Sequence, residues 1–213
     1  AVIKAVKKLK PNVGMLNPPY AQSKSDAELH ELYFVKQMLD SLEPGAIGVA
    51  IVPMSCAISP NPVREELMKR HTLDAVMSMP QELFYPVGVV TCIMVWIAGQ
   101  AHAVSDRKTW FGYWRDDGFI KTKNKGRIDQ NDVWPGIRDR WVEMYRNREV
   151  HAGNSVIQKV TAADEWCAEA YMETDYSKLT QADFERVVRN YAIYRLLGSQ
   201  SHAAEGKNDE NGE

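Results

Sequence analysis

The chain has 213 residues, of which 45% are hydrophobic and 25% are charged, and its formal net charge is −2 at pH 7. This composition is typical of one folded globular domain with a helical appendage. It excludes a uniformly basic surface, so contact with nucleic acid would need local clusters of cations or a basic partner subunit. No signal peptide and no apolar run of membrane-spanning length is recognised, so we expect no membrane contact. The three widely spaced cysteines, Cys56, Cys92 and Cys167, indicate free thiols, buried in two cases, and a cytoplasmic protein.

The first hundred residues alternate short apolar runs with amphipathic stretches, which predicts an α/β domain with a mostly parallel sheet. Strands are predicted at 13–16, 46–52, 73–79 and 89–97. We expect the last two to form an antiparallel pair at the sheet edge. Helices are predicted from Ser25, which can cap with Glu28, to Leu42, and from Asn61 to about Arg70.

The pattern changes after Gly99. Residues 110–114 predict a strand that enters a tight turn at Gly118, and residues 121–127 read as a basic, flexible loop. Further helices are predicted at 132–147, 162–173 and 181–197, with Gly198 ending the last. The polar, acidic residues 199–213 predict a disordered tail.

Asn17-Pro18-Pro19-Tyr20, directly after the first apolar strand, is the most informative segment. Methylation of an exocyclic amino group requires two hydrogen-bond acceptors that free the nitrogen lone pair from the aromatic ring. The amide oxygen of Asn17 supplies one acceptor, and a main-chain carbonyl in a proline-stiffened segment supplies the other. Tyr20 offers a flat face for stacking a base. The structural alternative is an ordinary Asn-Pro turn.

The run from Val13 to Tyr20 resembles the catalytic motif of the N6-adenine DNA methylase family, in particular modification subunits of type I restriction-modification systems and related fused restriction enzymes. Residues 73–95 resemble the strand–loop–strand of that family, whose loop aromatic packs against the flipped adenine. Phe84 matches that aromatic best and Tyr85 is a nearby alternative. Phe84 is also consistent with a plain core aromatic.

The resemblance implies the later half of a Rossmann-like methyltransferase sheet, with S-adenosylmethionine as donor and adenine in duplex DNA as target. The family's glycine-rich donor loop and ribose-binding acid do not fit in the sixteen residues before Asn17. We therefore expect a fragment that lacks most of the donor site and is inactive alone. The implied partners are a specificity subunit or domain and a second modification subunit. The expected parts are residues 1–100 with the catalytic motif, 101–150 with a sheet-edge hairpin, basic loop and helix, 151–198 with C-terminal helices, and the tail 199–213.

Four cations lie in the predicted basic loop and can contact DNA phosphates or simply face solvent: Lys121, Lys123, Lys125 and Arg127. The five histidines show no ligand spacing, so no metal site is predicted. Two other functions remain open at the level of sequence. One is methylation of a protein glutamine or an RNA amino group, and the other is a non-catalytic interaction module.

Overall fold

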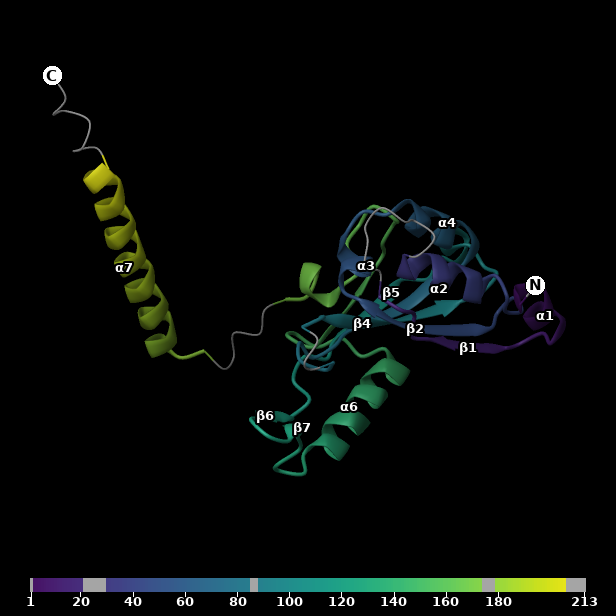
Figure 1. Ribbon diagram of the computed structural model, residues 1–213, viewed down its shortest axis with the longest axis horizontal. Coiled ribbons are helices and arrows are strands. Elements are labelled where there is room, and N and C mark those ends of the chain that lie inside the picture. The colour runs from purple at the N-terminus through teal and green to yellow at the C-terminus, as the bar shows by residue number, and fades with distance from the viewer. Residues whose placement is uncertain (1, 21–29, 85–87, 174–178, 206–213) are drawn as a thin grey trace, which may run out of the picture. The chain divides into compact units, whose positions relative to one another are not determined.

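A computed structural model describes residues 2–20, 30–84, 88–173 and 179–205 (Figure 1). The chain forms two compact units, residues 1–173 and 174–213. None of the helices among the described residues is both long and apolar enough to cross a membrane.

The first unit is built on a six-stranded sheet. Its strands, in spatial order, are β1 (Val13–Leu16), β2 (Ile47–Pro53), β4 (Thr91–Ile97), β3 (Thr72–Ser78), β5 (Thr109–Tyr113) and β8 (Ser155–Gln158). Strands β1, β2, β3 and β5 share one direction, and β4 and β8 oppose it. This arrangement confirms the predicted α/β fold with a mostly parallel sheet.

The expected antiparallel pair forms between β3 and β4, but it lies inside the sheet and not at its edge. The free side of β3 is covered by β5, which pairs with it in parallel. Every residue of β3 is buried, as expected for a strand with neighbours on both sides and cores on both faces.

Helices cover one face of the sheet and a single longer helix covers the other (Figure 1). The first face carries α2 (Glu31–Leu39), α3 (Ser55–Ile58) and α4 (Pro62–Arg70), while α1 (Val2–Lys8) precedes β1 and α5 (His102–Ser105) follows β4. Leu32, Val35 and Leu39 of α2 are buried in the core of that face. Met144 of α6 (Trp134–Asn147) packs in the opposite core with Trp110 and Met77. Alternate residues of β3 feed the two cores, since Val76 lies in one and Met77 in the other.

The beginnings of two helices test the sequence interpretation. Helix α4 begins after Asn61 as predicted, and the Oδ1 atom of Asn61 caps it by accepting a hydrogen bond from the backbone N–H of Val63 at 2.9 Å. In α2, the proposed cap residues Ser25 and Glu28 lie outside the described residues. The described helix begins at Glu31, and the Nδ1 atom of His30 accepts from the N–H of Leu32 at 3.2 Å.

The basic segment 121–127 is a β-hairpin and not a flexible loop. Its strands are β6 (Ile120–Thr122) and β7 (Gly126–Ile128), which pair antiparallel. The Thr122 hydroxyl donates to the Gly126 carbonyl at 2.9 Å and accepts from the Lys125 N–H at 3.1 Å, which closes the turn. Gly118, with φ 76°, makes the preceding turn as predicted.

The helix predicted at 162–173 is wrong. The chain there forms irregular structure with one short 3₁₀ turn, Ala168–Ala170, after the unpredicted strand β8. Three consecutive residues, Trp166, Cys167 and Ala168, are buried, which no single face of a helix can achieve.

The second unit contains α7 (Gln181–Glu205). The helix continues beyond Gly198, where the sequence predicted its end, so residues 199–205 of the expected disordered tail are helical. One interior glycine costs only about 1 kcal/mol relative to alanine, and glutamine, alanine and glutamate that follow it favour helix. Residues 206–213 lie outside the described part of the chain.

Candidate active site

Four strands, β1, β2, β3 and β5, run in the same direction, so their carboxyl ends lie at the same end of the sheet. The segments that follow three of these strands lie there. Residues 17–20 follow β1, residues 79–84 follow β3, and Trp114 and Arg115 follow β5. The carboxyl ends of parallel strands are where open α/β sheets bind their ligands.

The residues of the 17–20 motif differ in how far they are exposed to solvent. Asn17 is exposed, so its amide oxygen is accessible to a ligand, whereas Pro18 is buried and fixes the backbone. Tyr20 is half-buried, and its hydroxyl is buried without a hydrogen-bond partner among the described residues. The motif thus places an exposed acceptor beside a partly exposed ring.

The two aromatic residues predicted to hold a base lie next to each other. The ring centroids of Tyr20 and Phe84 are 6.2 Å apart, and the rings meet edge to face at 85°. These residues come from segments after different strands, so the fold and not the chain brings them together. Phe84 is half-buried, which leaves part of its ring accessible. The alternative residue Tyr85 lies outside the described residues.

The surroundings of Tyr20 are apolar and acidic. Burial raises the pKa of the Tyr20 phenol, and the nearby Glu31 carboxylate raises it further.

Burial also raises the pKa of the Cys56 and Cys92 thiols, which keeps both protonated at neutral pH. All three cysteines are free and buried, which agrees with the sequence interpretation of two of them and extends it to the third.

The structure also assembles a group that the sequence did not suggest. His30, Glu31 and Cys56 each offer a possible metal-ligand atom, and these atoms lie within 4.8 Å of one another. The Nδ1 atom of His30 already accepts the helix-capping hydrogen bond of α2. The Cys56 thiol lies 3.8 Å from Oε2 of Glu31, as a donor to it. These hydrogen bonds explain why the three side chains lie together: His30 caps α2, and Cys56 donates to the buried Glu31.

A polar brace fixes the start of the 79–84 loop. Glu169 accepts from the Ser78 hydroxyl at 2.6 Å and from Nη2 of Arg115 at 2.5 Å. Arg115 also donates through Nη1 to the Met79 carbonyl at 3.2 Å. Burial alone raises the pKa of Glu169, but the hydrogen bonds from Ser78 and Arg115 outweigh it and the pKa is lowered. Sequence reasoning missed this brace, because no local pattern links its members.

The four cations predicted to contact DNA divide into two pairs. Lys121 forms an ion pair with Glu82 at 2.7 Å, and Arg127 forms one with Asp117 at 2.6 Å. Lys123 and Lys125 are exposed in the hairpin turn. Among the described residues, no acidic group pairs with the ammonium groups of these two lysines.

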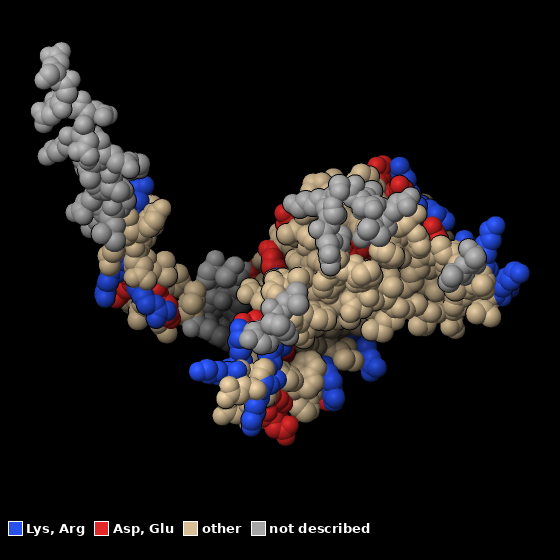
Figure 2. Space-filling model, viewed as in Figure 1, with Lys and Arg blue, Asp and Glu red and all other residues tan. Residues whose placement is uncertain are grey.

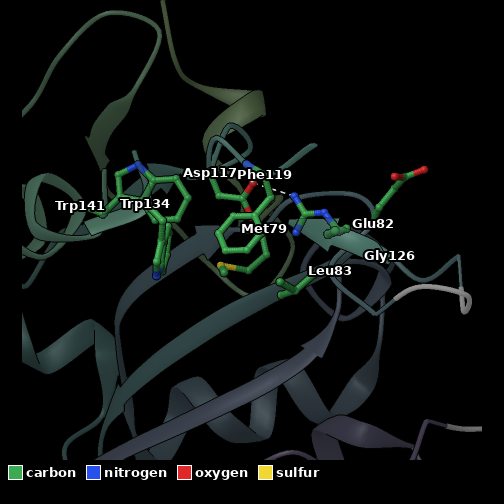
Figure 3. A pocket seen from close by; sticks show the side chains of 9 residues that line it. Met79, Glu82, Leu83, Asp117, Phe119, Gly126, Trp134 and Trp141 are labelled. Atoms are coloured by element: carbon green, nitrogen blue, oxygen red, sulfur yellow. Dashed lines mark hydrogen bonds and ion pairs between the residues drawn. The ribbon is translucent and has the colours of Figure 1, made fainter. Parts of the chain in front are cut away.

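A pocket of about 370 Å³ opens beside the 79–84 loop (Figure 3). Its walls come from that loop, the segment after β5, the β6–β7 hairpin and helix α6. The lining residues are Met79, Glu82, Leu83, Asp117, Phe119, Gly126, Arg127, Trp134 and Trp141.

Comparison with known proteins gives consistent matches. A family model described as N-6 DNA methylase matches residues 12–195. The type II restriction enzyme and methyltransferase RM.BcgI of Heyndrickxia coagulans is 29% identical, over 85% of this chain and 29% of its own length.

Solved structures show the same fold. The methyltransferase subunit of a type I restriction-modification system from Streptococcus thermophilus matches with a TM-score of 0.54 at 16% identity, over 70% of this chain and 34% of that chain. A chain from a type I restriction-modification complex matches with a TM-score of 0.53 at 16% identity, over 97% of this chain and 47% of its own. The present chain thus spans less than half the length of each of these proteins.

The family match covers the 17–20 motif, the loop that carries Phe84 and the basic hairpin. It confirms the resemblance seen in the sequence. The protein belongs to the N-6 DNA methylase family.

Proposed function

We propose that this chain holds the target base in a DNA adenine-N6 methyltransferase of a restriction-modification system. The observation that carries the proposal is the contact between Tyr20 and Phe84 beside the exposed Asn17, at the carboxyl end of β1. An adenine turned out of the duplex finds there a stacking surface and hydrogen-bond acceptors for its amino group.

The chemistry assigned to the 17–20 motif concerns the amino nitrogen. The Asn17 amide oxygen accepts one N–H, and a carbonyl of the proline segment accepts the other. With both hydrogens held, the nitrogen becomes more tetrahedral and its lone pair is available for methylation. No general base is needed, because the amine loses its proton after the transfer. Stacking on aromatic side chains contributes about 1–3 kcal/mol per base.

The donor implied by the family is S-adenosylmethionine, and we propose that most of its site lies outside the described residues. None of the four codirectional strands is followed by a glycine-rich turn within the described residues. The outer edge of β1 has no strand partner among them, and its Val13 and Met15 are 65% and 73% exposed. We propose that further strands of the complete methyltransferase continue the sheet at this edge and carry the donor site.

The donor proposal predicts a difference between this chain and its full-length parent. Isothermal titration with S-adenosylmethionine is expected to give little or no heat of binding for the chain and a clear binding isotherm for the parent. Micromolar binding by the chain alone would contradict it.

The proposed partners are duplex DNA, a specificity subunit or domain that reads the sequence, and a second modification subunit. The relatives described above belong to type I and type II restriction-modification systems, which supports this assignment. Such a system acts on DNA in the cytoplasm, and the free cysteines are compatible with that location.

The test is methylation of plasmid DNA by the full-length parent, with N6-methyladenine measured by mass spectrometry of nucleosides. Asn17→Ala is expected to lower the rate roughly 100-fold or more, as removal of one positioned hydrogen-bonding group does elsewhere. Asn12→Ala is the matched control, because Asn12 is exposed just before the opposite end of β1. Its rate is expected to stay within about twofold of the wild type.

Three outcomes would contradict the proposal. Normal methylation by Asn17→Ala would remove the role of Asn17. Selective methylation of a protein glutamine or of RNA in competition assays would replace the substrate, and loss of all methyl transfer by the parent would favour a non-catalytic interaction module.

A further inference from the structure

The 370 Å³ pocket lies next to the proposed adenine site. The 79–84 loop contributes to both, but the rings of Tyr20 and Phe84 do not line the pocket. Met79, Glu82 and Leu83 line the pocket, while Phe84 in the same turn faces Tyr20. The other walls come from the β6–β7 hairpin and α6. A ligand in this pocket would therefore lie beside a base held at Tyr20 and Phe84.

The walls of the pocket are aromatic and held in place. Phe119 meets Trp134 edge to face at 5.8 Å, and Trp134 meets Trp141 edge to face at 5.5 Å. Trp141 in turn stacks on the buried Trp114 at 5.1 Å with only 2° between the ring planes. Asp129 accepts from the backbone N–H of Trp134 at 3.0 Å and fixes the start of α6. Figure 3 shows Phe119 and Met79 at the centre of the lining, with the tryptophans on one side.

The polar edge of the pocket is an ion pair that is largely shielded from water. The side chains of Arg127 and Asp117 are 15% and 7% exposed and lie 2.6 Å apart. The Arg127 guanidinium also lies 5.4 Å from the centre of the Phe119 ring. A guanidinium has five N–H donors, so its bond to Asp117 leaves donors for the edge of a planar ligand. In Figure 3 the Glu82 carboxylate points away from this pair.

Two exposed lysines stand near the pocket. Lys123 and Lys125 stand exposed in the hairpin turn, next to Gly126 and Arg127 of the lining. Figure 2 shows basic side chains gathered over the β6–β7 hairpin. These charges suit the phosphates of a strand whose base enters the pocket. The volume of about 370 Å³ also lies in the range of small-ligand pockets, roughly 300–1,000 Å³.

We propose that this pocket holds a second nucleobase of the duplex, one that leaves the stack when the target adenine is turned out. The inference rests on the proposed function. Turning out one base removes a stacking partner from its neighbours and the pairing partner from its opposite base, and a second aromatic site offsets that loss. Phe119 and Trp134 provide the stacking faces, Arg127 provides donors to the base edge, and Lys123 and Lys125 hold the backbone.

The test is a scan of DNA binding by the full-length parent, with the sequence that it methylates. Duplexes carry a single abasic nucleotide at each position around the target adenine and opposite it. Binding is measured for the wild type, for Phe119→Leu, which removes the ring but stays apolar, and for Phe119→Tyr, which keeps the ring. Circular dichroism checks that each variant is folded.

We expect Phe119→Leu to weaken binding of intact DNA roughly 10-fold, as loss of one stacking contact does. At one position the abasic duplex is expected to bind wild type and Phe119→Leu equally, because the base that Phe119 contacts is already missing. Phe119→Tyr is expected to bind like the wild type. A Lys123→Gln and Lys125→Gln double variant should weaken all duplexes alike and reduce the salt dependence.

Two results would overturn the second base site. Either Phe119→Leu binds intact DNA as tightly as the wild type, or its loss of affinity is the same at every abasic position. Methylation of adenine and its loss in Asn17→Ala are measured separately. If the parent methylates adenine and Asn17→Ala does not, but the abasic scan gives either of these two results, only the second base site is wrong. If the wild-type parent makes no N6-methyladenine, the proposed function falls first.

Discussion

Asp74 shows how one buried side chain can join distant parts of this fold. It is 4% exposed on β3 and accepts hydrogen bonds from Nε of Arg107, from Arg148 at 3.1 Å and from the Tyr145 hydroxyl at 3.0 Å. Burial, followed by this carboxylate, raises the pKa of Tyr145 to about 12. The acid thereby ties α6, and with it one wall of the pocket, to the centre of the sheet.

Asp74→Asn is expected to destabilise the chain by about 2–4 kcal/mol, because it leaves two guanidinium groups without their charge partner; the partial exposure of Arg107 keeps the cost below that of a fully buried pair. Urea denaturation followed by tryptophan fluorescence measures it. Asp106→Asn serves as the control, since Asp106 forms an ion pair with Lys159 but is 93% exposed. Equal stability of the two variants would contradict the role given to Asp74.

Two buried histidines predict a pH dependence of stability. Nδ1 of His71 accepts from the N–H of Gly99 at 3.1 Å, and Nδ1 of His102 accepts from the N–H of Leu73 at 3.2 Å. Burial lowers the pKa of both rings, and for His71 it outweighs the opposing hydrogen bond to Asp40. Both rings are therefore neutral in the folded chain at pH 7.

The unfolded chain binds these protons first as the pH falls below the ordinary histidine value of about 6.5. The free energy of unfolding is therefore expected to fall between pH 7.5 and 5.5, by at most about 1.4 kcal/mol per pH unit for each histidine. Urea denaturation at several pH values measures the slope, and His71→Gln with His102→Gln should flatten it. Stability that is constant across this interval in the wild type would refute the assignment.

At the scale of elements, the sequence predicts strands that form continuous apolar runs. The strands at 13–16, 46–52, 73–79 and 89–97 and the beginning of α4 near Asn61 are confirmed within two residues for this reason. The β6–β7 hairpin and β8 were missed because their strands are only three or four residues long and mix polar with apolar residues. The consecutive burial of Trp166, Cys167 and Ala168 depends on the sheet beneath them, which no local pattern contains.

Some residues of the candidate site could be predicted from the sequence and others could not. The 17–20 motif and Phe84 could be found by sequence, because a contiguous motif and a strand–loop–strand pattern mark them. The brace formed by Arg115 and Glu169 could not, since the two residues are 54 positions apart and meet only in the folded chain. The pocket behind the loop likewise draws on four separate segments.

The brace predicts an effect on catalysis without contact with the base. Glu169→Gln is expected to slow methylation by the full-length parent roughly 10-fold, because it weakens charge-assisted hydrogen bonds that hold the 79–84 loop. Glu169 is a positioning residue, so kcat should fall more than DNA affinity. Steady-state kinetics with the parent separates the two quantities.

Glu165→Gln is the matched control for this brace, because Glu165 is exposed on the same segment. It should keep wild-type kinetics. A loss in Glu169→Gln that appears only as weaker DNA binding would mean that Glu169 does not position the loop.

At the scale of the whole molecule, two apolar surfaces are exposed to solvent in the described part of the chain. One is the outer edge of β1, with Val13 and Met15, and the other is a stripe on α7. The chain spans less than half the length of its matched relatives. Surfaces of this kind mark places where other parts of a protein or another subunit bind.

The α7 stripe consists of Phe184, Val187, Val188, Tyr191 and Tyr194, which are all at least 52% exposed. Their spacing of three and four residues places them on one helix face, the pattern that packs against another helix. We predict that this face binds a helix of a partner subunit in the proposed restriction-modification complex. Val188→Asp is expected to abolish the complex, because it places a charge in an apolar contact.

Ile193→Asp adds the same charge to the opposite face of the helix, where Ile193 is 48% exposed, and is the matched control. Size-exclusion chromatography with light scattering, on the parent mixed with its partner subunits, gives the mass of the complex for each variant. Val188→Asp is expected to elute as separate subunits and Ile193→Asp as the intact complex. Because α7 belongs to the second compact unit, Val188→Asp should leave the urea denaturation of the sheet unit unchanged. If both variants assemble like the wild type, the stripe is not the contact surface.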